Sequence, residues 1–434
     1  MGAEEKGWNP VAAMEEIREV GRGAPEERRK EKEKEKEKDG VPSIPSSTKE
    51  IDISLPFAEM KPSIIDLCKD LFRKWSSLDN SCFSIETVSG GITNLLLKVS
   101  VKEESGNDVS LTVRLYGPNT DLVIDRKREL QAIPYLSAAG FGAKLLGIFK
   151  NGIIQSFINA RTLSPSVQLG CVAHGSPPLL CQVMAKTLCT IWNDIFILSI
   201  FYISDMSNPK IAAEIAKQLY KFHQVDIPGS REAQLWNDVF KFLEKAAVLQ
   251  FDDNEKQAKY ETISFKEICN EINALKELTD LLNAPVVFAH NDLLSGNLML
   301  NDEEGKLYFI DFEYGSYSYR GYDIANHFNE YAGFDCDYNL YPEKNVQCHF
   351  FQNYLRPDRP HEVPDKDLEA LYIETNTFRL ASHIYWALWA LIQAKVSPID
   401  FDYLCYFFLR YNEYKKEKEA CFFLAQKYLS GSRV

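Results

Sequence analysis

The stretch "AHNDLLSGNLMLNDEEGKLYFIDFEY", residues 289–314, decides how this chain is expected to fold and to work. It places three polar side chains, Asp292, Asn297 and Asp311, among residues that are typical of strands and turns. The part "LMLNDEEGKLYFIDFE" indicates a strand, a turn at Gly305 and a second strand that delivers Asp311. The three side chains are therefore expected to belong to one site.

This pattern favours phosphoryl transfer. Such enzymes need a carboxylate that orients the acceptor hydroxyl and oxygen ligands for the Mg²⁺ that bridges the ATP phosphates. Protein kinases use HRDxxxxN and then a hairpin that ends in DFG, and "HNDLLSGN" has the same five-residue step from Asp292 to Asn297. We expect Asp292 to accept the hydrogen bond of the hydroxyl, and Asn297 and Asp311 to hold the metal. Each fragment alone could be an ordinary turn or a buried strand, but the ordered set favours a site.

Two upstream features should accompany such a site. In "VSGGITNLL", Gly90 and Gly91 would let backbone amides approach the phosphates, although an ordinary hairpin turn is the alternative. In "TVRLYG", Arg114 occupies the place of a phosphate-binding cation on the third strand, and Glu129 in "RKREL" is its expected partner on a helix. The alternative is a surface ion pair worth roughly 0–1 kcal/mol.

Downstream residues combine aromatic faces with a carboxylate. Trp386 and Trp389 are three apart on a predicted long helix and so share a face, and Tyr406 follows them. With Glu330 they could attract an ammonium group through cation–π and Coulomb interactions, although both tryptophans could instead be core residues. Asp323 and Arg320 are expected to tie down a loop.

The composition narrows the class of protein. The chain has 434 residues, 45% hydrophobic and 26% charged, with a net charge of −13, which weighs against nucleic-acid binding. An acidic protein suits a cationic small molecule, or the charge merely keeps it soluble. Ten irregularly spaced cysteines form no CxxC pair, which argues against zinc and disulfides. Because "MGAEEKGWNP" lacks the apolar region of a secretory signal, we expect a cytoplasmic location.

The pattern changes along the chain and predicts an α+β architecture with two lobes and a cleft between them. Residues 1–57 read as a disordered charged tail. Residues 58–158 are expected to form a small antiparallel sheet with one inserted helix, and 159–434 a larger, mainly helical lobe. Helical patterns recur at about 232–248, 255–283 and 365–395, and Asn208 and Pro209 are expected to begin another helix.

With "RLYG", "HNDLLSGN", "IDFEYGSYSYRGYDIANHFNEY" and "WALWALIQAK", the chain resembles the choline/ethanolamine kinase family from about residue 58 onward. The resemblance implies a protein-kinase-like fold with ATP bound between the lobes. It also implies Mg²⁺- and ATP-dependent phosphorylation of ethanolamine to phosphoethanolamine in phosphatidylethanolamine biosynthesis. A homodimer is left open. The resemblance implies that Asp292 is the catalytic base and that Asn297 and Asp311 are magnesium ligands. It implies that Arg114 clamps the phosphates, with Glu129 as its brace, and that Phe157 and Ile158 in "QSFINAR" form the hinge that contacts adenine. The amine pocket that it implies consists of Glu330, Trp386, Trp389 and Tyr406.

Residues 167–204 depart from the family pattern, in which "INARTLSPS" would run almost directly into "DMSNPKIAAEIA". We interpret this segment as extra sequence, such as a retained intron or a mispredicted exon; a functional insertion that docks on the lobe or touches a membrane is the alternative. Its apolar run "IFILSIFYI" is nine residues long, and a membrane span needs roughly 20, so no stable span is expected.

Two further hypotheses stay open. Choline or another amino alcohol could be the acceptor, although Asp335 and Asp337 in "GFDCDY" favour a primary ammonium with its three N–H donors. Choline lacks those donors and favours an aromatic cage. The second hypothesis is a protein of another class, namely a nucleotide-binding or scaffolding pseudokinase that residues 167–204 have disabled.

Overall fold

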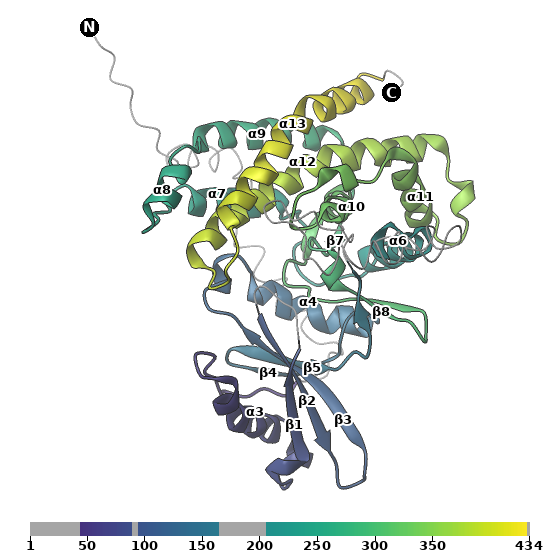
Figure 1. Cartoon of the computed structure of the whole chain (residues 1–434). Coiled ribbons are helices and arrows are strands. Elements are labelled where there is room, and N and C mark those ends of the chain that lie inside the picture. Colours follow the sequence, from purple (N-terminus) through teal and green to yellow (C-terminus); the bar gives the residue numbers. More distant parts are fainter. Residues whose placement is uncertain (1–43, 89–93, 165–204, 432–434) are drawn as a thin grey trace, which may run out of the picture.

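The computed structural model describes residues 44–88, 94–164 and 205–431, and divides them between a sheet-rich lobe and a larger helical lobe (Figure 1). Five antiparallel strands form the N-terminal sheet in the order β1-β2-β3-β5-β4. One helix is inserted between the third and fourth strands, as the sequence predicts. The elements of this lobe are α3 (Phe57–Leu71), η1 (Arg73–Trp75), η2 (Asn80–Cys82), β1 (Phe83–Thr87), β2 (Asn94–Lys102), β3 (Asp108–Tyr116), η3 (Thr120–Leu122), α4 (Arg126–Ala138), β4 (Leu145–Phe149) and β5 (Gly152–Ser156).

The N-terminal lobe has its own core between α3 and the sheet. Ile64, Cys68 and Leu71 of α3, with Trp75 of η1, are buried there against alternate residues of β2 and β3. Gly152 begins β5 where a Cβ atom would lie 2.2 Å from the carbonyl oxygen of the neighbouring strand β3, so a larger residue would push the two strands apart. The lobe is therefore a packed unit that can hold side chains of β3 in fixed positions.

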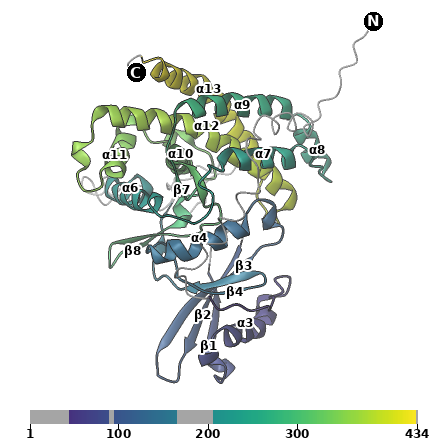
Figure 2. The same ribbon diagram turned by 180° about the vertical axis from the view of Figure 1, so that it is seen from behind.

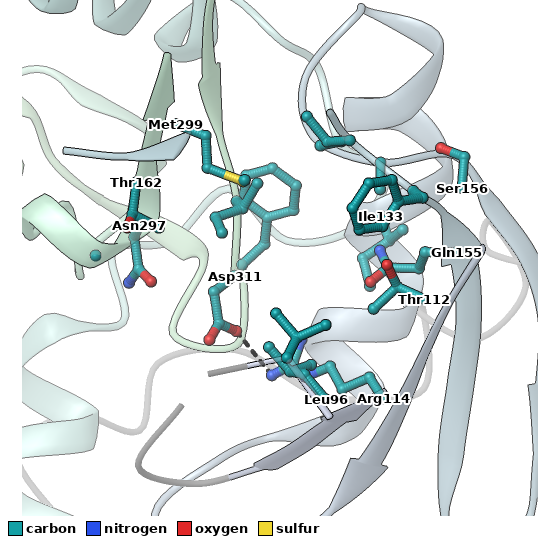
Figure 3. A pocket seen from close by; sticks show the side chains of 17 residues that line it. Leu96, Thr112, Arg114, Ile133, Gln155, Ser156, Thr162, Asn297, Met299 and Asp311 are labelled. Carbon is teal, nitrogen blue, oxygen red and sulfur yellow. Dashed lines mark ion pairs between the residues drawn. The ribbon is translucent and has the colours of Figure 1, made fainter. Parts of the chain in front are cut away.

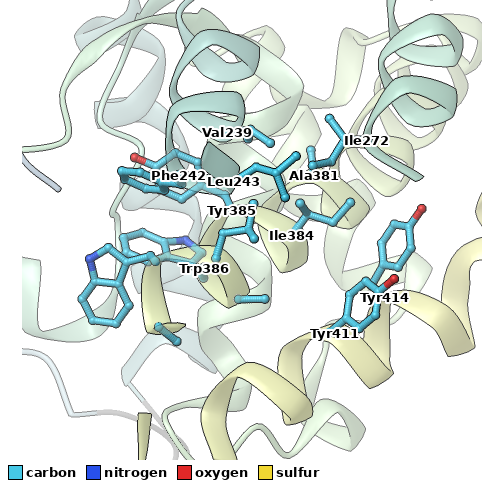
Figure 4. Packing of buried hydrophobic residues seen from close by; sticks show 14 of the residues in the cluster. Val239, Phe242, Leu243, Ile272, Ala381, Ile384, Tyr385, Trp386, Tyr411 and Tyr414 are labelled. Atoms are coloured by element: carbon cyan, nitrogen blue, oxygen red, sulfur yellow. The ribbon is translucent and has the colours of Figure 1, made fainter. Parts of the chain in front are cut away.

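The helical lobe is organised around one long buried helix, α12 (Asp365–Val396). Its segment "FRLASHIYWALWALIQ" is buried on all sides, because other helices pack around it (Figures 1 and 4). In both views, α4 lies between the sheet and this lobe (Figures 1 and 2). The remaining elements are β6 (Arg161–Thr162), η4 (Asp205–Ser207), α6 (Pro209–His223), α7 (Leu235–Ala246), α8 (Asn254–Tyr260), α9 (Phe265–Leu281), β7 (Val286–Ala289), η5 (Ser295–Asn297), β8 (Leu298–Asn301), β9 (Lys306–Phe309), β10 (Ser316–Tyr319), α10 (Arg320–Asn329), η6 (Glu330–Ala332), η7 (Tyr338–Leu340), α11 (Lys344–Leu355), η8 (Pro360–Glu362) and α13 (Tyr403–Leu429).

Local signals placed most helix ends correctly. Asn208 caps α6 by accepting a hydrogen bond from the backbone of Lys210 at 3.0 Å, and Pro209 is the first helical residue, as predicted. The single helix predicted at 255–283 is wrong, since the chain forms α8 and α9 with a break between them. The reason is a second cap, because the Ser264 hydroxyl accepts from the backbone of Glu267 and starts a new helix.

Residues 44–57 were predicted to belong to the disordered tail, and this part of the prediction is wrong. Ser46 forms a parallel bridge with Ile148 at the edge strand β4. Further on, the side-chain amide of Asn151 pairs with both backbone groups of Ile51, at 3.0 and 2.8 Å, and the Ile51 side chain is buried. Tertiary contacts with the β4–β5 turn thus order a segment whose Ser- and Pro-rich composition had suggested disorder.

Several predictions fall outside the described residues. Gly90, Gly91 and the segment 167–204 are among them, as are residues 1–43 of the predicted tail. The cysteines that the structure describes are all free thiols. Within the same described part of the chain, no helix has both the length and the apolar character that crossing a membrane requires.

The two ends that flank residues 165–204 meet. The backbone N–H and the hydroxyl of Ser164 both donate to the Asp205 carboxylate at 2.8 Å. Deleting residues 167–204 would leave Pro165 and Ser166 between these partners, which suits a four-residue turn with Pro in its second position. We predict that the deletion variant folds with the melting temperature of the full chain or higher, and with a higher soluble yield, because an apolar run is removed. Thermal unfolding and soluble expression beside the full chain measure this, and an insoluble deletion variant would contradict it.

Two buried histidines predict how stability depends on pH. Burial lowers the pKa of His327 to about 4 and holds the pKa of His383 well below 6.5, an effect that Arg410 and Arg379 strengthen. Unfolded histidine binds a proton near 6.5, so the unfolded state gains protons first and the free energy of unfolding falls as the pH drops from about 6.5 towards 4. We expect His383→Leu to reduce this acid sensitivity and to leave stability at pH 7 equal or higher.

The matched variant is His327→Leu. The His327 ring bonds the backbone oxygen of Leu293 at 2.8 Å through Nδ1, whereas neither ring nitrogen of His383 has a hydrogen-bond partner among the residues that the structure describes. His327→Leu should therefore cost about 1–3 kcal/mol at pH 7, while His383→Leu should not. Urea unfolding at pH 7.5 and 5.5 measures both effects, and equal losses for the two variants at pH 7.5 would refute the assignment.

Candidate active site

A buried carboxylate on α10 fixes the loop that carries Asp292. The Asp323 side chain accepts hydrogen bonds from the backbone N–H groups of His290 at 2.8 Å and Asn291 at 2.7 Å, and its Oδ2 lies 2.9 Å from His223 Nε2. Burial alone would raise the pKa of Asp323, but the hydrogen bond and charge of His223 and the neighbouring His290 outweigh it and lower the pKa. The predicted role of Asp323 in tying down a loop is confirmed.

The loop is also held from its other side. His290 Nε2 lies 2.9 Å from the carbonyl oxygen of Ile310, the residue that precedes Asp311. Asn291 has a φ of 64°, a conformation that non-glycine residues seldom adopt without support. Together these contacts fix the backbone immediately before Asp292, whose side chain is buried.

Asp292 and Asn297 touch each other. The Asn297 amide donates to the Asp292 carboxylate at 2.9 Å and to the Asp292 backbone oxygen at 2.8 Å, so its carbonyl oxygen is the end left to face a ligand. Burial raises the pKa of Asp292 well above its usual value, and the carboxylates of Glu330, Asp311 and Glu313 raise it further. A carboxyl group of this kind holds or accepts a proton according to the charge placed beside it.

The hairpin β8–β9 delivers Asp311 to the same crevice, as predicted. The backbone N–H of Ile310 donates to the carbonyl oxygen of Asn297 at 3.0 Å, and Asp311 itself has a φ of 62°. Burial raises the pKa of Asp311 to about 7, although Arg114 lies against it with 2.7 Å between the charged atoms and opposes this rise (Figure 3). The three side chains of the opening motif are therefore brought together.

Arg114 and Glu129 form the predicted pair, and they are buried rather than on the surface. Arg114 Nη1 lies 2.7 Å from Glu129 Oε1, while Nη2 contacts both Asp311 and Glu313. Burial would lower the pKa of Arg114, but these three carboxylates outweigh it and raise the pKa. The guanidinium thus joins β3 and α4 of one lobe to the segment after β9 of the other.

Sequence reasoning missed three members of this cluster, namely Glu313, Arg126 and Asn94. Arg126 lies 2.8 Å from Glu129 and 3.3 Å from Glu313, and donates to Asn94 at 3.1 Å. The Asn94 amide donates to Glu313 at 2.9 Å. A signal for Glu313 was its place two residues after Asp311, and for Arg126 its place one helical turn before Glu129.

An open pocket lies between the lobes and is lined by residues of both. In Figure 3, Asn297 and Met299 lie on one side, Gln155 and Thr112 on the other, and Asp311 between them. The predicted hinge residues Phe157 and Ile158 also line it. Gly90 and Gly91, predicted to cover phosphates, lie outside the described residues.

The predicted amine-pocket residues lie in two groups, and the side chains within each group contact one another or share a partner. The rings of Trp386 and Trp389 are 5.3 Å apart, and Tyr314 packs 5.2 Å from Trp386 while its hydroxyl accepts from Trp389 Nε1 at 2.8 Å. Glu330 and Tyr406 both accept hydrogen bonds from buried Arg410, at 3.2 and 3.1 Å. Tyr314 and Arg410 were not predicted.

Two details change the expected charge of this pocket. Glu330 was predicted as a carboxylate for an ammonium group, and it already forms an ion pair with Arg410. Asp335 is exposed, and the Asp337 carboxylate caps its own turn by accepting from the backbone of Asn339 at 3.2 Å. The preference for ethanolamine that these two residues suggested therefore gains no support from their positions.

The oxygen atoms present fit a magnesium ion. No group of three or more His, Cys, Asp or Glu side chains within the described ranges could hold a metal by itself. Magnesium bound to a nucleotide needs only one or two protein ligands, because phosphates and water supply the rest. The free amide oxygen of Asn297 and the carboxylate of Asp311, on one wall of one pocket, meet that requirement.

The buried cluster predicts a large effect on stability for Glu313→Ala. This change leaves the guanidinium groups of Arg114 and Arg126 without one of their partners, which should lower the free energy of unfolding by about 3–5 kcal/mol. The control is Arg231→Gln, which removes an exposed ion pair with Asp226 and should cost roughly 0–1 kcal/mol. Urea unfolding compares the two variants, and losses of similar size would show that the cluster does not join the lobes.

Comparison with known proteins agrees with this geometry. A family model described as choline/ethanolamine kinase matches residues 85–169 and 198–415. The unmatched residues 170–197 lie within the segment 167–204 that the sequence analysis set apart. The probable ethanolamine kinase of Arabidopsis thaliana is 60% identical over 389 residues, which cover 90% of this chain and 94% of that protein.

More distant relatives show the same likeness. The probable ethanolamine kinase A of Dictyostelium discoideum is 34% identical over 83% of this chain and 93% of its own length. Among solved structures, the Plasmodium vivax ethanolamine kinase superposes with a TM-score of 0.66 at 27% identity, covering 91% of this chain and 96% of that one. The two-lobed, protein-kinase-like fold expected from the sequence is confirmed.

Proposed function

The chain belongs to the choline/ethanolamine kinase family, and from this premise we propose that it is an ethanolamine kinase, which transfers a phosphoryl group from ATP to the hydroxyl oxygen of ethanolamine. One observation carries the proposal. Asn297 and Asp311 line one pocket between the lobes, and the Asp292 carboxylate accepts from the Asn297 amide at 2.9 Å, an arrangement that suits an acceptor carboxylate beside two metal ligands. No part of this set is missing, which weighs against the alternative of a scaffolding pseudokinase.

In this proposal each residue acts on a stated atom. Asp292 accepts the hydrogen bond of the acceptor hydroxyl and takes its proton as the oxygen attacks phosphorus. Asn297 and Asp311 would hold Mg²⁺, which when bound neutralises charge on the phosphate oxygens and orients them. Arg114 binds phosphate oxygens with its planar fork, and Glu129 keeps that fork in place.

Two further groups of residues would recognise the rest of the substrates. Phe157 and Ile158 line the pocket on the β5 side and would contact adenine. The aromatic faces of Trp386, Trp389 and Tyr406, with the Glu330 carboxylate, would bind the ammonium group.

Choline stays the second candidate acceptor. The contacting rings of Tyr314, Trp386 and Trp389 would also suit a quaternary ammonium. We favour ethanolamine because the most similar relatives described above carry that name. The cytoplasmic location and the homodimer stay predictions.

The experiment is phosphoryl transfer from ATP with Mg²⁺ to ethanolamine and choline in competition. We expect ethanolamine to be the preferred acceptor of the full chain. Asp292→Asn should lower kcat by about 10²–10⁴-fold with little change in the KM for ATP, because it removes the proton acceptor and keeps the shape.

Asp302→Asn is the matched control, since this exposed carboxylate lies on the hairpin between Asn297 and Asp311 and faces Arg161 instead of the pocket. It should retain full activity. Preference for choline would refute the choice of acceptor. Undiminished turnover in Asp292→Asn would refute the assignment of the base.

A further inference from the structure

A chain of buried hydrogen bonds connects the loop of Asp292 with the proposed amine pocket, and its centre is Asn326 on α10. Asn326 is fully buried, and its Nδ2 donates to the carbonyl oxygen of Asn291 at 3.0 Å, next to Asp292 in the chain. On the other side, its Oδ1 accepts from Trp386 Nε1 at 2.6 Å and from Ser382 Oγ at 2.7 Å. One side-chain amide therefore touches the base loop and the aromatic wall at once.

The series of hydrogen bonds continues through Ser382 and Arg410 to the carboxylate of Glu330. Arg410 Nη2 donates to Ser382 Oγ at 3.0 Å and to the Ser382 backbone oxygen at 3.3 Å. The other terminal nitrogen of Arg410, Nη1, holds Glu330 and Tyr406. We call these residues, Asn326, Ser382 and Arg410 with the side chains that they hold, the Asn326 network.

Asparagine suits this position for a chemical reason. Its amide donates through nitrogen and accepts through oxygen, and both ends are used here. A carboxylate could not donate to the Asn291 carbonyl, and a hydrophobic side chain would leave several buried polar groups without partners.

The helix α10 cannot shift to compensate for a substitution of Asn326. Asp323 and His327, one turn before and one residue after Asn326, hold the backbone of residues 290, 291 and 293. The distance from α10 to the base loop is thus fixed independently of the amide. What the amide adds is the link from that loop to Trp386 and, through Ser382, to Arg410.

We propose that Asn326 is a positioning residue that sets the separation between the base and the ammonium-binding wall, so that the enzyme selects amino alcohols with two carbon atoms between nitrogen and hydroxyl. This inference rests on the proposed function, because it assigns the two ends of the pocket to the hydroxyl and the ammonium group. With a rigid separation, an acceptor of matching length reacts faster than a longer one, since an error of about 1 Å in placing a reacting atom lowers the rate on the order of 10²-fold.

The test compares two acceptors that differ by one methylene, ethanolamine and 3-aminopropan-1-ol, with the full chain and three variants. Asn326→Ala should lower kcat/KM for ethanolamine by about 30–100-fold and for the longer alcohol much less. The ratio of the two kcat/KM values should thus fall at least about tenfold, with the KM for ATP unchanged within about twofold. Ser382→Ala, which removes the link to Arg410 and keeps the Asn326 amide, should lower the same ratio about 3–5-fold.

Asn329→Ala is the matched control. Asn329 is a buried asparagine one turn further along α10, and it donates to the carbonyl oxygen of Arg379 at 3.2 Å, away from the base loop. It should lower the melting temperature and leave the ratio at the wild-type value. A purely structural role for Asn326 would behave in the same way, with equal losses for both acceptors.

The outcomes separate the inference from the function on which it rests. Wild-type turnover with an unchanged ratio in Ser382→Ala, and in Asn326→Ala where that variant folds, overturns the inference and leaves the kinase assignment intact. No turnover of any amino alcohol by the wild type overturns the proposed function and the inference with it. A fall of the ratio in both variants, and not in Asn329→Ala, supports the inference.

Discussion

The contact on which the site depends is the buried carboxylate of Asp323 beneath the backbone of residues 290 and 291. A buried charge costs several kcal/mol unless hydrogen bonds compensate it, and here two backbone N–H groups and the ring of His223 do so. In return the carboxylate holds Asn291 in a left-handed conformation that costs about 1–3 kcal/mol when unsupported. The direction in which Asp292 points is thus decided by a residue that no substrate reaches.

A second buried charge relates the two lobes. Arg114 directs one terminal nitrogen to Glu129 on α4 and the other to Asp311 and Glu313 beyond the hairpin β8–β9. A lysine would present one point charge, which could not meet acids in two directions with fixed geometry. The fork therefore explains why an arginine stands where protein kinases carry a lysine, and it makes the width of the cleft depend on ion pairs within it.

The sequence predicted the side-chain positions that follow from spacing along the chain, and it missed those that depend on tertiary packing. The interval from Asp292 to Asn297 and the hairpin to Asp311 depend on neighbours in the chain, and the three side chains do lie close to one another. Arg410 and Asn326 carry no such signal, because each contacts the site from a helix far away in sequence, and asparagine or arginine on a helix is most often exposed. Residues 44–57 were misjudged for the same reason, since the Asn151 side chain that orders them lies a hundred residues further on.

The charges around Asp292 suggest how an acceptor would prepare its own base. Burial opposes the ionisation of Asp292, and the carboxylates of Glu330, Asp311 and Glu313 add to this effect, although Arg410 is paired with Glu330. These neighbouring anions therefore contribute to the raised pKa of Asp292. An ammonium group in the aromatic pocket would supply a positive charge and lower this pKa. The Asp292 carboxyl group would then ionise more readily where an amino alcohol is bound than in an empty site.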